Sequence, residues 1–278
     1  MTRAEIPVLD AATVMLVRDA SSGGLEVFML RRRLQSDFVG GAYVFPGGAV
    51  DPPDRAEHLE SICAGRSDAD ASTRLGVSSG GLGYWVAAVR ECFEEAGFLL
   101  AYDSAGRVVS LEEPVVAERF NLHRAAVDTG QRDLADVCAE ESLQLAVDRM
   151  SYFSRWITPK GAPRRYDTRF FLAEAPTGQT PLHDGRETIT HCWVKPHDAV
   201  EAHDRGEFPL IFPTYRSLVA LSRFDVAADA LAAAAAIDVV PAVEPRVVAD
   251  EGGGVRILLP GDPGFDTADT PTLRQESA

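Results

Sequence analysis

The chain has 278 residues, 46% of them hydrophobic and 25% charged, a composition typical of a protein that buries a sizeable core. Its 27 basic and 42 acidic residues give a formal net charge of −15, which disfavours general binding to nucleic acid or to an anionic membrane. No stretch approaches the ~18 consecutive apolar residues of a membrane span, and the first residues include no apolar signal region, so we expect a cytoplasmic protein. The four cysteines form no close pair, which argues against a zinc site or a disulfide framework.

Two apolar segments near the N-terminus, residues 11–17 and 25–30, flank turn-forming residues and predict a β-hairpin. Three consecutive arginines follow the second strand. Arg31 and Arg33 are candidates for contacts with a substrate phosphate, and an ordinary solvated cationic loop is the alternative. The segment 45–51 then begins Phe-Pro-Gly-Gly after another apolar run, and its two glycines allow the backbone to approach a ligand closely.

Residues 55–89 are rich in aspartate, serine, glycine and alanine. We expect them to form a partly helical surface excursion, because a long loop costs only slightly more closure entropy than a short one. The flanking segments can therefore remain adjacent in space.

The segment 87–98 predicts a helix that ends in a left-handed cap at Gly97. Three carboxylates gather on one face, at spacings of three and four residues: Glu91, Glu94 and Glu95. Like charges at these spacings repel one another, and Mg²⁺ or Mn²⁺ would neutralise them through oxygen ligands. A solvated acidic face is the alternative. The predicted apolar stripe consists of Trp85, Val89, Cys92 and Ala96.

The rest of the chain alternates between predicted strands and helices. We expect strands at 99–102, 108–110, 152–158, 168–173, 188–194 and 255–259, helices at 115–127, 132–150 and 196–205, one or two helices over 214–237, and a polar tail from residue 266. His123 is expected on a helix surface without a role. The loop between the strands 152–158 and 168–173 concentrates positive charge, and guanidinium groups suit phosphate because they donate two hydrogen bonds at once. A simple cationic loop is again the alternative for these candidates: Lys160, Arg164, Arg165 and Arg169.

Two separated segments together resemble the box of the Nudix hydrolases, G-x5-E-x7-R-E-U-x-E-E-x-G-U, where U is apolar. Gly48 and Asp54 match the first half, with aspartate in place of glutamate, and residues 90–98 match the second half. Thirty-five residues lie between the halves, where the standard box has seven. The chain is thus similar to the interrupted-box branch, which includes peroxisomal coenzyme A diphosphatases and their bacterial relatives. A coenzyme A motif of that branch is matched at Gly41, but Asp37 stands at its arginine position.

This resemblance implies metal ligands at the three helix glutamates and at the backbone carbonyl of Gly47. It implies that Arg90 orients a box carboxylate, that Glu91 takes part in water activation and that Asp54 supports the site indirectly. A glutamate outside the box often assists the metal or acts as general base. Glu187 is the candidate for that role, ahead of Glu140 and Glu141.

The resemblance further implies a Nudix-type α/β/α sandwich with a mixed sheet and extra C-terminal helices. We predict a Nudix domain over residues 1–236, with the insert at about 55–84, and an appendage with a polar tail over 237–278. The expected reaction is metal-dependent hydrolysis of a diphosphate in a nucleoside diphosphate derivative, with coenzyme A or acyl-coenzyme A as candidates. Nucleotide sugars, ADP-ribose and dinucleotides are alternative substrates, and a non-catalytic nucleotide-binding module is an alternative of another class. The sequence leaves open whether the chain forms a homodimer.

Overall fold

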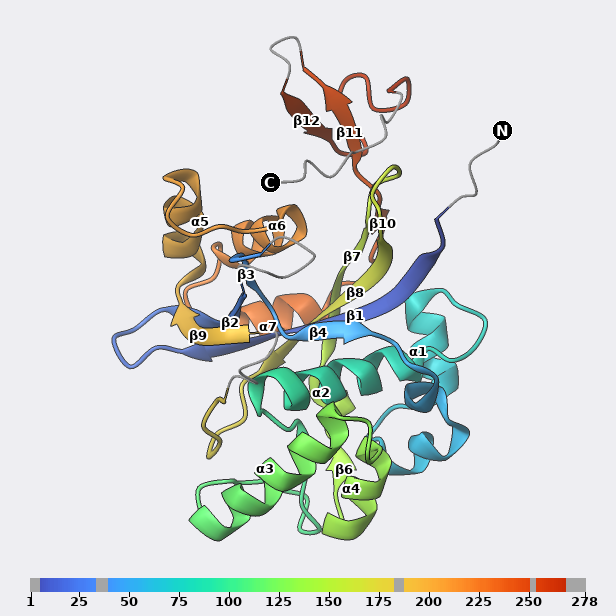
Figure 1. Cartoon of the computed structure of the whole chain (residues 1–278), viewed down its shortest axis with the longest axis vertical. Coiled ribbons are helices and arrows are strands. Elements are labelled where there is room, and N and C mark those ends of the chain that lie inside the picture. Colours follow the sequence, from blue (N-terminus) through green and yellow to red (C-terminus); the bar gives the residue numbers. More distant parts are fainter. Residues whose placement is uncertain (1–5, 34–39, 183–187, 251–253, 269–278) are drawn as a thin grey trace.

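An eight-stranded mixed sheet crosses the protein, and helices cover both of its faces (Figure 1). The computed structural model describes residues 6–33, 40–182, 188–250 and 254–268. The strand order is β10-β7-β8-β1-β2-β3, with β4 paired to β1 and β9 paired to β2. The strands are β1 (Val8–Asp19), β2 (Leu25–Arg32), β3 (Tyr43–Val44), β4 (Gly47–Ala49), β7 (Ser151–Ile157), β8 (Arg165–Glu174), β9 (Thr188–Val194) and β10 (Ala242–Val243).

The sheet divides between β1 and β2. The C-terminal part of β1 pairs with β2 in the predicted hairpin, whereas residues 11–13 pair with β4. β3 pairs with the far end of β2, so the chain crosses from one strand to the other at Phe45 and Pro46. The parallel pairing of β1 with β8 makes the sheet mixed, as predicted. As a result, β4 with its two glycines, Gly47 and Gly48, lies beside β1.

The helices form one layer on each face, and each layer encloses its own apolar core. On one face lie α1 (Asp68–Leu75), α2 (Leu82–Ala96), α3 (Pro114–Asp128) and α4 (Leu134–Glu141), with the short 3-10 helices η1 (Pro52–Arg55), η2 (Glu57–Ile62) and η3 (Val147–Arg149) and the strand pair β5 (Ala101–Tyr102) and β6 (Gln144–Leu145). On the other face lie α5 (Pro196–Asp204), α6 (Phe212–Leu221) and α7 (Ala227–Ala235). The predicted α/β/α sandwich is confirmed. Within the described ranges, none of the helices combines the length and apolarity that crossing a membrane requires.

Helix α2 packs against the sheet through the predicted apolar stripe. The side chains of Trp85, Val89, Cys92 and Ala96 have no exposed surface. Gly97 ends the helix with φ of 73°, a left-handed conformation that glycine adopts without strain, and its N–H donates to the carbonyl of Phe93. The helix begins at Leu82, directly after Gly81, so it extends beyond the predicted segment 87–98 and includes Trp85 of the predicted stripe.

The insert contributes to the core, which corrects the expected surface excursion. It is partly helical as predicted, with η2 and α1, but Leu59, Ala71 and Leu75 are buried in the same core as α2. The peptide of Gly81 lies against α1 so closely that an added Cβ would be 2.4 Å from the backbone nitrogen of Ser72. Apolar residues scattered among polar ones gave no clear period, and the contribution of the insert was therefore missed.

Other sequence expectations also need correction. The helix predicted at 132–150 is the shorter α4, followed by β6 and η3, whereas the region 214–237 contains the two helices α6 and α7, within the prediction of one or two. His123 is 6% exposed and packs between α3 and α4, whereas we expected it at the surface. The four cysteines are free, in agreement with the absence of a predicted disulfide framework.

The domain boundary predicted after residue 236 stays a prediction. β10 follows that boundary and pairs with β7 in the main sheet. The separate pair β11 (Arg246–Ala249) and β12 (Val255–Leu258) comes after it.

If the insert belongs to the core, then Leu75→Ala should lower the free energy of unfolding by about 2–4 kcal/mol, since it leaves a cavity beneath α1. The matched control is Thr73→Ala on the exposed side of the same helix, which should change stability by less than about 0.5 kcal/mol. Chemical denaturation measures both. If both substitutions lowered the free energy of unfolding by the same small amount, the insert would not contribute to the core.

Candidate active site

The glycine turn and helix α2 meet although thirty-five residues separate the two halves of the box. The backbone N–H of Gly47 in β4 donates to Glu95 Oε2 at 2.9 Å. A Cβ on Gly48 would lie 2.4 Å from Glu91 Oε1, so only glycine lets this carboxylate rest on the strand. The predicted adjacency of the two segments is confirmed, and it comes from direct contact between β4 and the helix.

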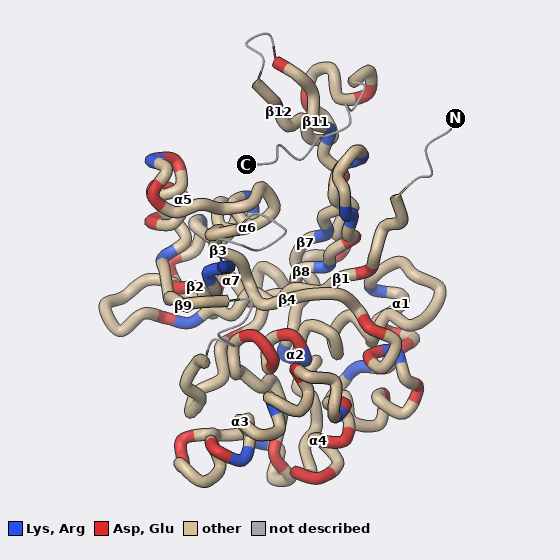
Figure 2. Tube along the Cα trace, in the orientation of Figure 1, with Lys and Arg blue, Asp and Glu red and all other residues tan. Residues whose placement is uncertain are grey.

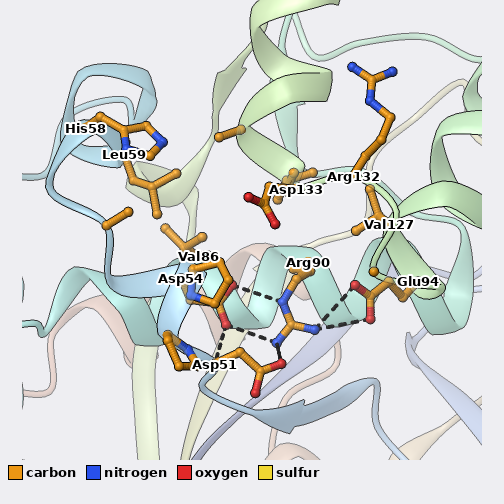
Figure 3. Close-up of a pocket in the computed structure, with 16 residues that line it drawn as sticks. Asp51, Asp54, His58, Leu59, Val86, Arg90, Glu94, Val127, Arg132 and Asp133 are labelled. Carbon is orange, nitrogen blue, oxygen red and sulfur yellow. Dashed lines mark hydrogen bonds and ion pairs between the residues drawn. The ribbon is translucent and has the colours of Figure 1, made fainter.

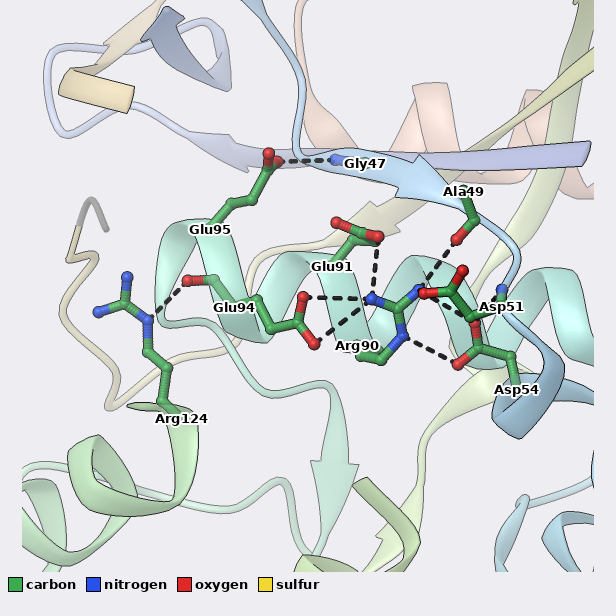
Figure 4. Close-up of polar contacts among 9 residues, drawn as sticks. All are labelled: Gly47, Ala49, Asp51, Asp54, Arg90, Glu91, Glu94, Glu95 and Arg124. Carbon is green, nitrogen blue, oxygen red and sulfur yellow. Dashed lines mark hydrogen bonds and ion pairs between the residues drawn. The ribbon is translucent and has the colours of Figure 1, made fainter. Parts of the chain in front are cut away.

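Arg90 is the centre of the site, and Figure 4 shows its guanidinium surrounded by oxygen atoms. It forms a fork with Asp54, from Nε to Oδ1 at 2.9 Å and from Nη2 to Oδ2 at 3.0 Å. Nη1 donates to Glu91 Oε1 at 2.9 Å and to Glu94 Oε2 at 3.1 Å. Nη2 also donates to the carbonyl of Ala49 at 2.9 Å. One side chain therefore joins η1, β4 and two glutamates of α2.

The local electrostatics are dominated by burial of carboxylates. Burial raises the pKa of Glu91 to about 7, the positive charge of Arg90 opposes this shift, and the negative charge of Glu94 adds to it. Burial also raises the pKa of Glu94. For Arg90, burial disfavours the charged form, but the hydrogen bonds with Asp54 and the surrounding negative charges outweigh it and raise the pKa. Arg90 is thus charged, while its neighbours carry more negative charge than it can neutralise.

These residues fit a divalent cation. The helix glutamates offer only carboxylate oxygens, the ligands that Mg²⁺ and Mn²⁺ prefer. Their side chains lie on the C-terminal half of α2, where Arg90 contacts two of them, Glu91 and Glu94. Buried like charges without enough compensation favour binding of a cation.

A cavity of about 270 Å³ lies on the side of Arg90 that faces away from the strand (Figure 3). The insert supplies one wall with His58 and Leu59, and the connection between α3 and α4 supplies another with Asp133. The floor of the cavity is formed by Val86, Arg90 and Glu94, which lie on successive turns of α2. The long insertion therefore forms one wall of the cavity next to Arg90.

The basic residues near the tip of the β7–β8 hairpin lie apart from the carboxylate cluster, whereas the guanidinium carbon of Arg169 in β8 lies 4.4 Å from the ring centre of Tyr84 in α2. Figure 2 shows acidic positions along α2 and basic positions on β7 and β8, and in Figure 1 the hairpin extends toward β10 and β11, away from α2. Arg165 is 5% exposed and pairs with Glu244 at 2.6 Å, while Arg169 is 2% exposed and pairs with Asp167 at 2.8 Å. The structure thus uses these two arginines in internal ion pairs. Lys160 and Arg164 are exposed at the hairpin.

The remaining predicted site residues occupy other positions. Arg31 lies at the end of β2 with its guanidinium 5.5 Å from the ring centre of Tyr43, and its Nε donates to the carbonyl of Gly41 at 3.4 Å. Since Met29 packs in the core under α5–α7, strand alternation places Arg31 on that face and not on the face of α2. Arg33 is exposed. Glu187 and Asp37 lie outside the described residues, and the role of Glu187 stays a prediction.

Two residues that contact the site were not among the candidates from the sequence. Asp51 Oδ2 lies 3.5 Å from Arg90 Nη2, and its N–H donates to Asp54 Oδ2 at 2.8 Å. Arg124, from α3, donates to the backbone carbonyl of Glu94 at 2.8 Å (Figure 4). Asp51 belonged to the recognised turn, and a capping pattern with Asp54 three residues later was readable there. Arg124 is brought in by tertiary packing alone.

A second group of ionisable side chains lies between α3 and α4. His123, Glu140 and Glu141 can bring one ligand atom each within 4.8 Å of one another. Arg119 already donates to both oxygens of Glu141, and Arg132 pairs with Glu140 at 2.8 Å. These ion pairs compensate the charge of the group, so the box cluster fits a cation better. The weaker general-base candidates, Glu140 and Glu141, are part of this paired group.

Comparison with known proteins identifies the class. The model of the NUDT19 Nudix domain matches residues 69–221, which is more than half of the chain. The crystal structure of a Nudix hydrolase from Alicyclobacillus acidocaldarius has a TM-score of 0.68 and 27% sequence identity, and the match covers 82% of this chain and 97% of that one. The sandwich is therefore a Nudix fold. The chain belongs to the NUDT19 Nudix domain family, which confirms the resemblance seen in the sequence.

Relatives with an assigned activity carry the same family name. Acyl-coenzyme A diphosphatase NUDT19 of Gallus gallus is 29% identical over 234 residues, which is 72% of this chain and 61% of that protein. Acyl-coenzyme A diphosphatase NUDT19 of Homo sapiens is 25% identical over 239 residues, which is 74% of this chain and 63% of that protein. The matched region thus spans about three fifths of the length of these relatives.

The buried carboxylates predict a pH-dependent cost in metal-free protein. Folded Glu91, with a pKa of about 7, retains a proton that the unfolded chain, at its ordinary 4.5, has lost, so stability falls as pH rises between these values. Glu91→Gln removes this term and should stabilise the protein by up to about 3 kcal/mol more at pH 8 than at pH 4. Denaturation in the presence of a chelator measures the difference.

Glu118→Gln, on the exposed side of α3, is the matched control and should show no such pH dependence. A stability difference between Glu91→Gln and wild type that stays constant from pH 4 to pH 8 would contradict the assigned burial cost.

Proposed function

We propose that this protein is a Nudix diphosphatase that hydrolyses coenzyme A or an acyl-coenzyme A at its diphosphate in the presence of Mg²⁺ or Mn²⁺. The observation that carries the proposal is the carboxylate cluster beside the glycine turn, in which Arg90 holds Glu91 and Glu94 and the N–H of Gly47 holds Glu95. Family membership and the names of the acyl-coenzyme A diphosphatase relatives support it.

The reaction joins water to one phosphorus and breaks the bond between the bridging oxygen and that phosphorus. Coenzyme A would yield 3′,5′-ADP and 4′-phosphopantetheine. We assign Glu91, Glu94 and Glu95 as metal ligands, with the carbonyl of Gly47 as a further ligand. A bound divalent cation would screen the substrate's negative charge and lower the pKa of an attacking water.

The protein's own groups position this chemistry. Arg90 keeps the carboxylates of Glu91 and Glu94 together because one of its nitrogens donates to both. The N–H of Gly47 fixes Glu95 against β4, and Asp54 fixes Arg90 through the fork. Glu91 is the group we propose for water activation. Such orienting hydrogen bonds matter as much as the charges themselves.

The substrate contacts follow from the remaining cations. Arg31, a candidate from the sequence, lies on the face of α5–α7, so we assign the diphosphate contact to the exposed Arg33, and Lys160 and Arg164 to the 3′-phosphate. Arg165, a candidate from the sequence, is paired with Glu244 and 5% exposed, so we give its part in phosphate binding to its exposed neighbours.

A substrate panel tests the function. Wild-type protein with Mg²⁺ or Mn²⁺ should release 3′,5′-ADP from coenzyme A and acyl-coenzyme A, as detected by chromatography and mass spectrometry. Glu95→Gln should lower kcat by about a hundredfold or more, because it removes a metal ligand, while Glu118→Gln should have wild-type activity. Preferred release of nucleotide from ADP-ribose, nucleotide sugars or dinucleotides would replace the substrate assignment. Metal binding without hydrolysis of any of them would favour the nucleotide-binding module.

A comparison of coenzyme A with dephospho-coenzyme A tests the phosphate assignment. If Lys160 and Arg164 hold the 3′-phosphate, their joint replacement by alanine should lower kcat/KM for coenzyme A by about ten- to a hundredfold and leave dephospho-coenzyme A unaffected. Arg33→Ala should weaken both substrates alike, since both contain the diphosphate. Equal kcat/KM values for both substrates in the wild type would contradict any contact with the 3′-phosphate.

A further inference from the structure

Arg55 is the last residue of η1 and directly follows Asp54. Its Nη2 lies 2.6 Å from Asp10 Oδ2 in β1, and its guanidinium carbon lies 5.1 Å from the centre of the Tyr84 ring in α2. A single side chain thus joins η1 to the sheet and to the first turn of the helix that carries the glutamates.

Two glycines leave room for this side chain at the other end of the insert. A Cβ on Gly83 would lie 2.8 Å from Arg55 Cγ and 3.0 Å from the carbonyl oxygen of Asp54. A Cβ on Gly80 would lie 3.1 Å from Arg55 Nη1. The stem of Arg55 therefore passes over the point where the chain returns to α2, and it closes the base of the insert.

The anchor on β1 is itself held on two sides. The carbonyl of Asp10 accepts a hydrogen bond from the N–H of Val50 at 2.9 Å, which ties it to the end of β4. Asp10 Oδ1 also lies 3.8 Å from Nη1 of the buried Arg169. The side chains of Arg55 and Asp10 are 33% and 42% exposed, so their pair adds little to overall stability. Its effect is on position, because the neighbouring residue is the partner of Arg90.

We propose that Arg55 is a positioning residue of the active site, which fixes η1 against β1 and α2 so that Asp54 meets Arg90 as a fork. In the standard box a seven-residue connection restricts how far the first half can move from the helix. In this chain thirty-five residues lie between, and the contacts of Arg55 supply the restriction. The inference rests on the proposed function, because the Arg90 fork orients the carboxylates assigned to the metal.

The test measures Mn²⁺ affinity by electron paramagnetic resonance in four single variants of the full chain. Arg55→Met keeps the length of the stem and removes the charge, and Arg55→Lys restores a charge. Gly83→Ala adds the methyl group that would displace the stem. Arg18→Met is the matched control, because Arg18 also pairs with a carboxylate, that of Glu26, and lies over an aromatic ring, but on the β1–β2 hairpin.

Arg55→Met should weaken Mn²⁺ binding about tenfold, the size seen when a group that orients a ligand is removed. Arg55→Lys should recover part of this loss. Gly83→Ala should also weaken binding, although alanine ordinarily favours a helix more than glycine does. Arg18→Met should bind as the wild type does. In turnover, kcat should fall in Arg55→Met while KM for the nucleotide changes little.

A double-mutant cycle with Asp54→Asn separates positioning from general destabilisation. If Arg55 acts through Asp54, adding Arg55→Met to Asp54→Asn should cause no further loss of Mn²⁺ affinity. The proposal would be overturned if the double variant lost Mn²⁺ affinity by the product of the two single losses. Wild-type Mn²⁺ affinity in Arg55→Met would overturn it as well.

Hydrogen exchange distinguishes failure of this inference from failure of the proposed function. The amide of Asp51 donates to Asp54 Oδ2, and it should exchange about tenfold faster in Arg55→Met while amides in β8 are unchanged. A wild type without Mn²⁺ binding or hydrolysis would overturn the proposed function, and the exchange rates would still decide the role of Arg55. An unchanged exchange rate of the Asp51 amide in Arg55→Met would then refute the positioning role of Arg55.

Discussion

The repulsion among the partly buried carboxylates around Arg90 is the constraint on which the site depends. Glu91 and Glu94 share one guanidinium nitrogen with each other, and Asp54 occupies the other two. A buried arginine that is forked by one carboxylate is strongly held in place, because it would leave an uncompensated charge if it moved. This arrangement fixes the carboxylates but does not neutralise them. A site with fixed oxygen ligands and surplus negative charge is suited to a divalent cation.

The same constraint explains how the box tolerates a long insertion. Loop closure becomes only slowly more costly with length, so thirty-five residues in place of seven are thermodynamically acceptable. Length alone, however, would leave Asp54 free to move relative to the helix. Buried residues such as Leu59 and Leu75 pack the insert into the core, and the Arg90 fork then joins the two halves directly. Contacts thus take over the role that a short connection has in the standard box.

The sequence predicted those parts of the structure that are determined locally. The apolar stripe of α2 and its end at Gly97 follow from helical periodicity and from glycine's access to positive φ. The resemblance to the Nudix box located the glutamates and Arg90 before any geometry was known. The sequence could not show that Arg165 is used in a pair with Glu244, because these residues are 79 positions apart. A basic loop indicates a phosphate site only where tertiary partners do not already compensate its charges.

The contribution of the insert was hidden for a related reason. Its buried residues belong to short helices whose polar neighbours obscure any period, so composition alone suggested a solvated segment. The burial of His123 was not predicted for the same reason. The sequence of α3 has no clear division into polar and apolar faces, and the face that is buried is the one that packs against α4. Segments with weak patterns take their structure from the surfaces they meet, and such surfaces exist only in the folded chain.

Stability and function oppose each other at this site. Glu91, whose pKa burial raises to about 7, costs folding free energy when it is ionised, and a neutral residue of the same shape would relieve that cost. A ligand that binds only to the folded state would offset the folding free energy lost when Glu91 is ionised, because such binding stabilises the folded state by mass action. A divalent cation held by Glu91, Glu94 and Glu95 meets this condition. The electrostatic cost of the metal-free cluster and its proposed affinity for metal would therefore both follow from one arrangement, set by the position of Arg90.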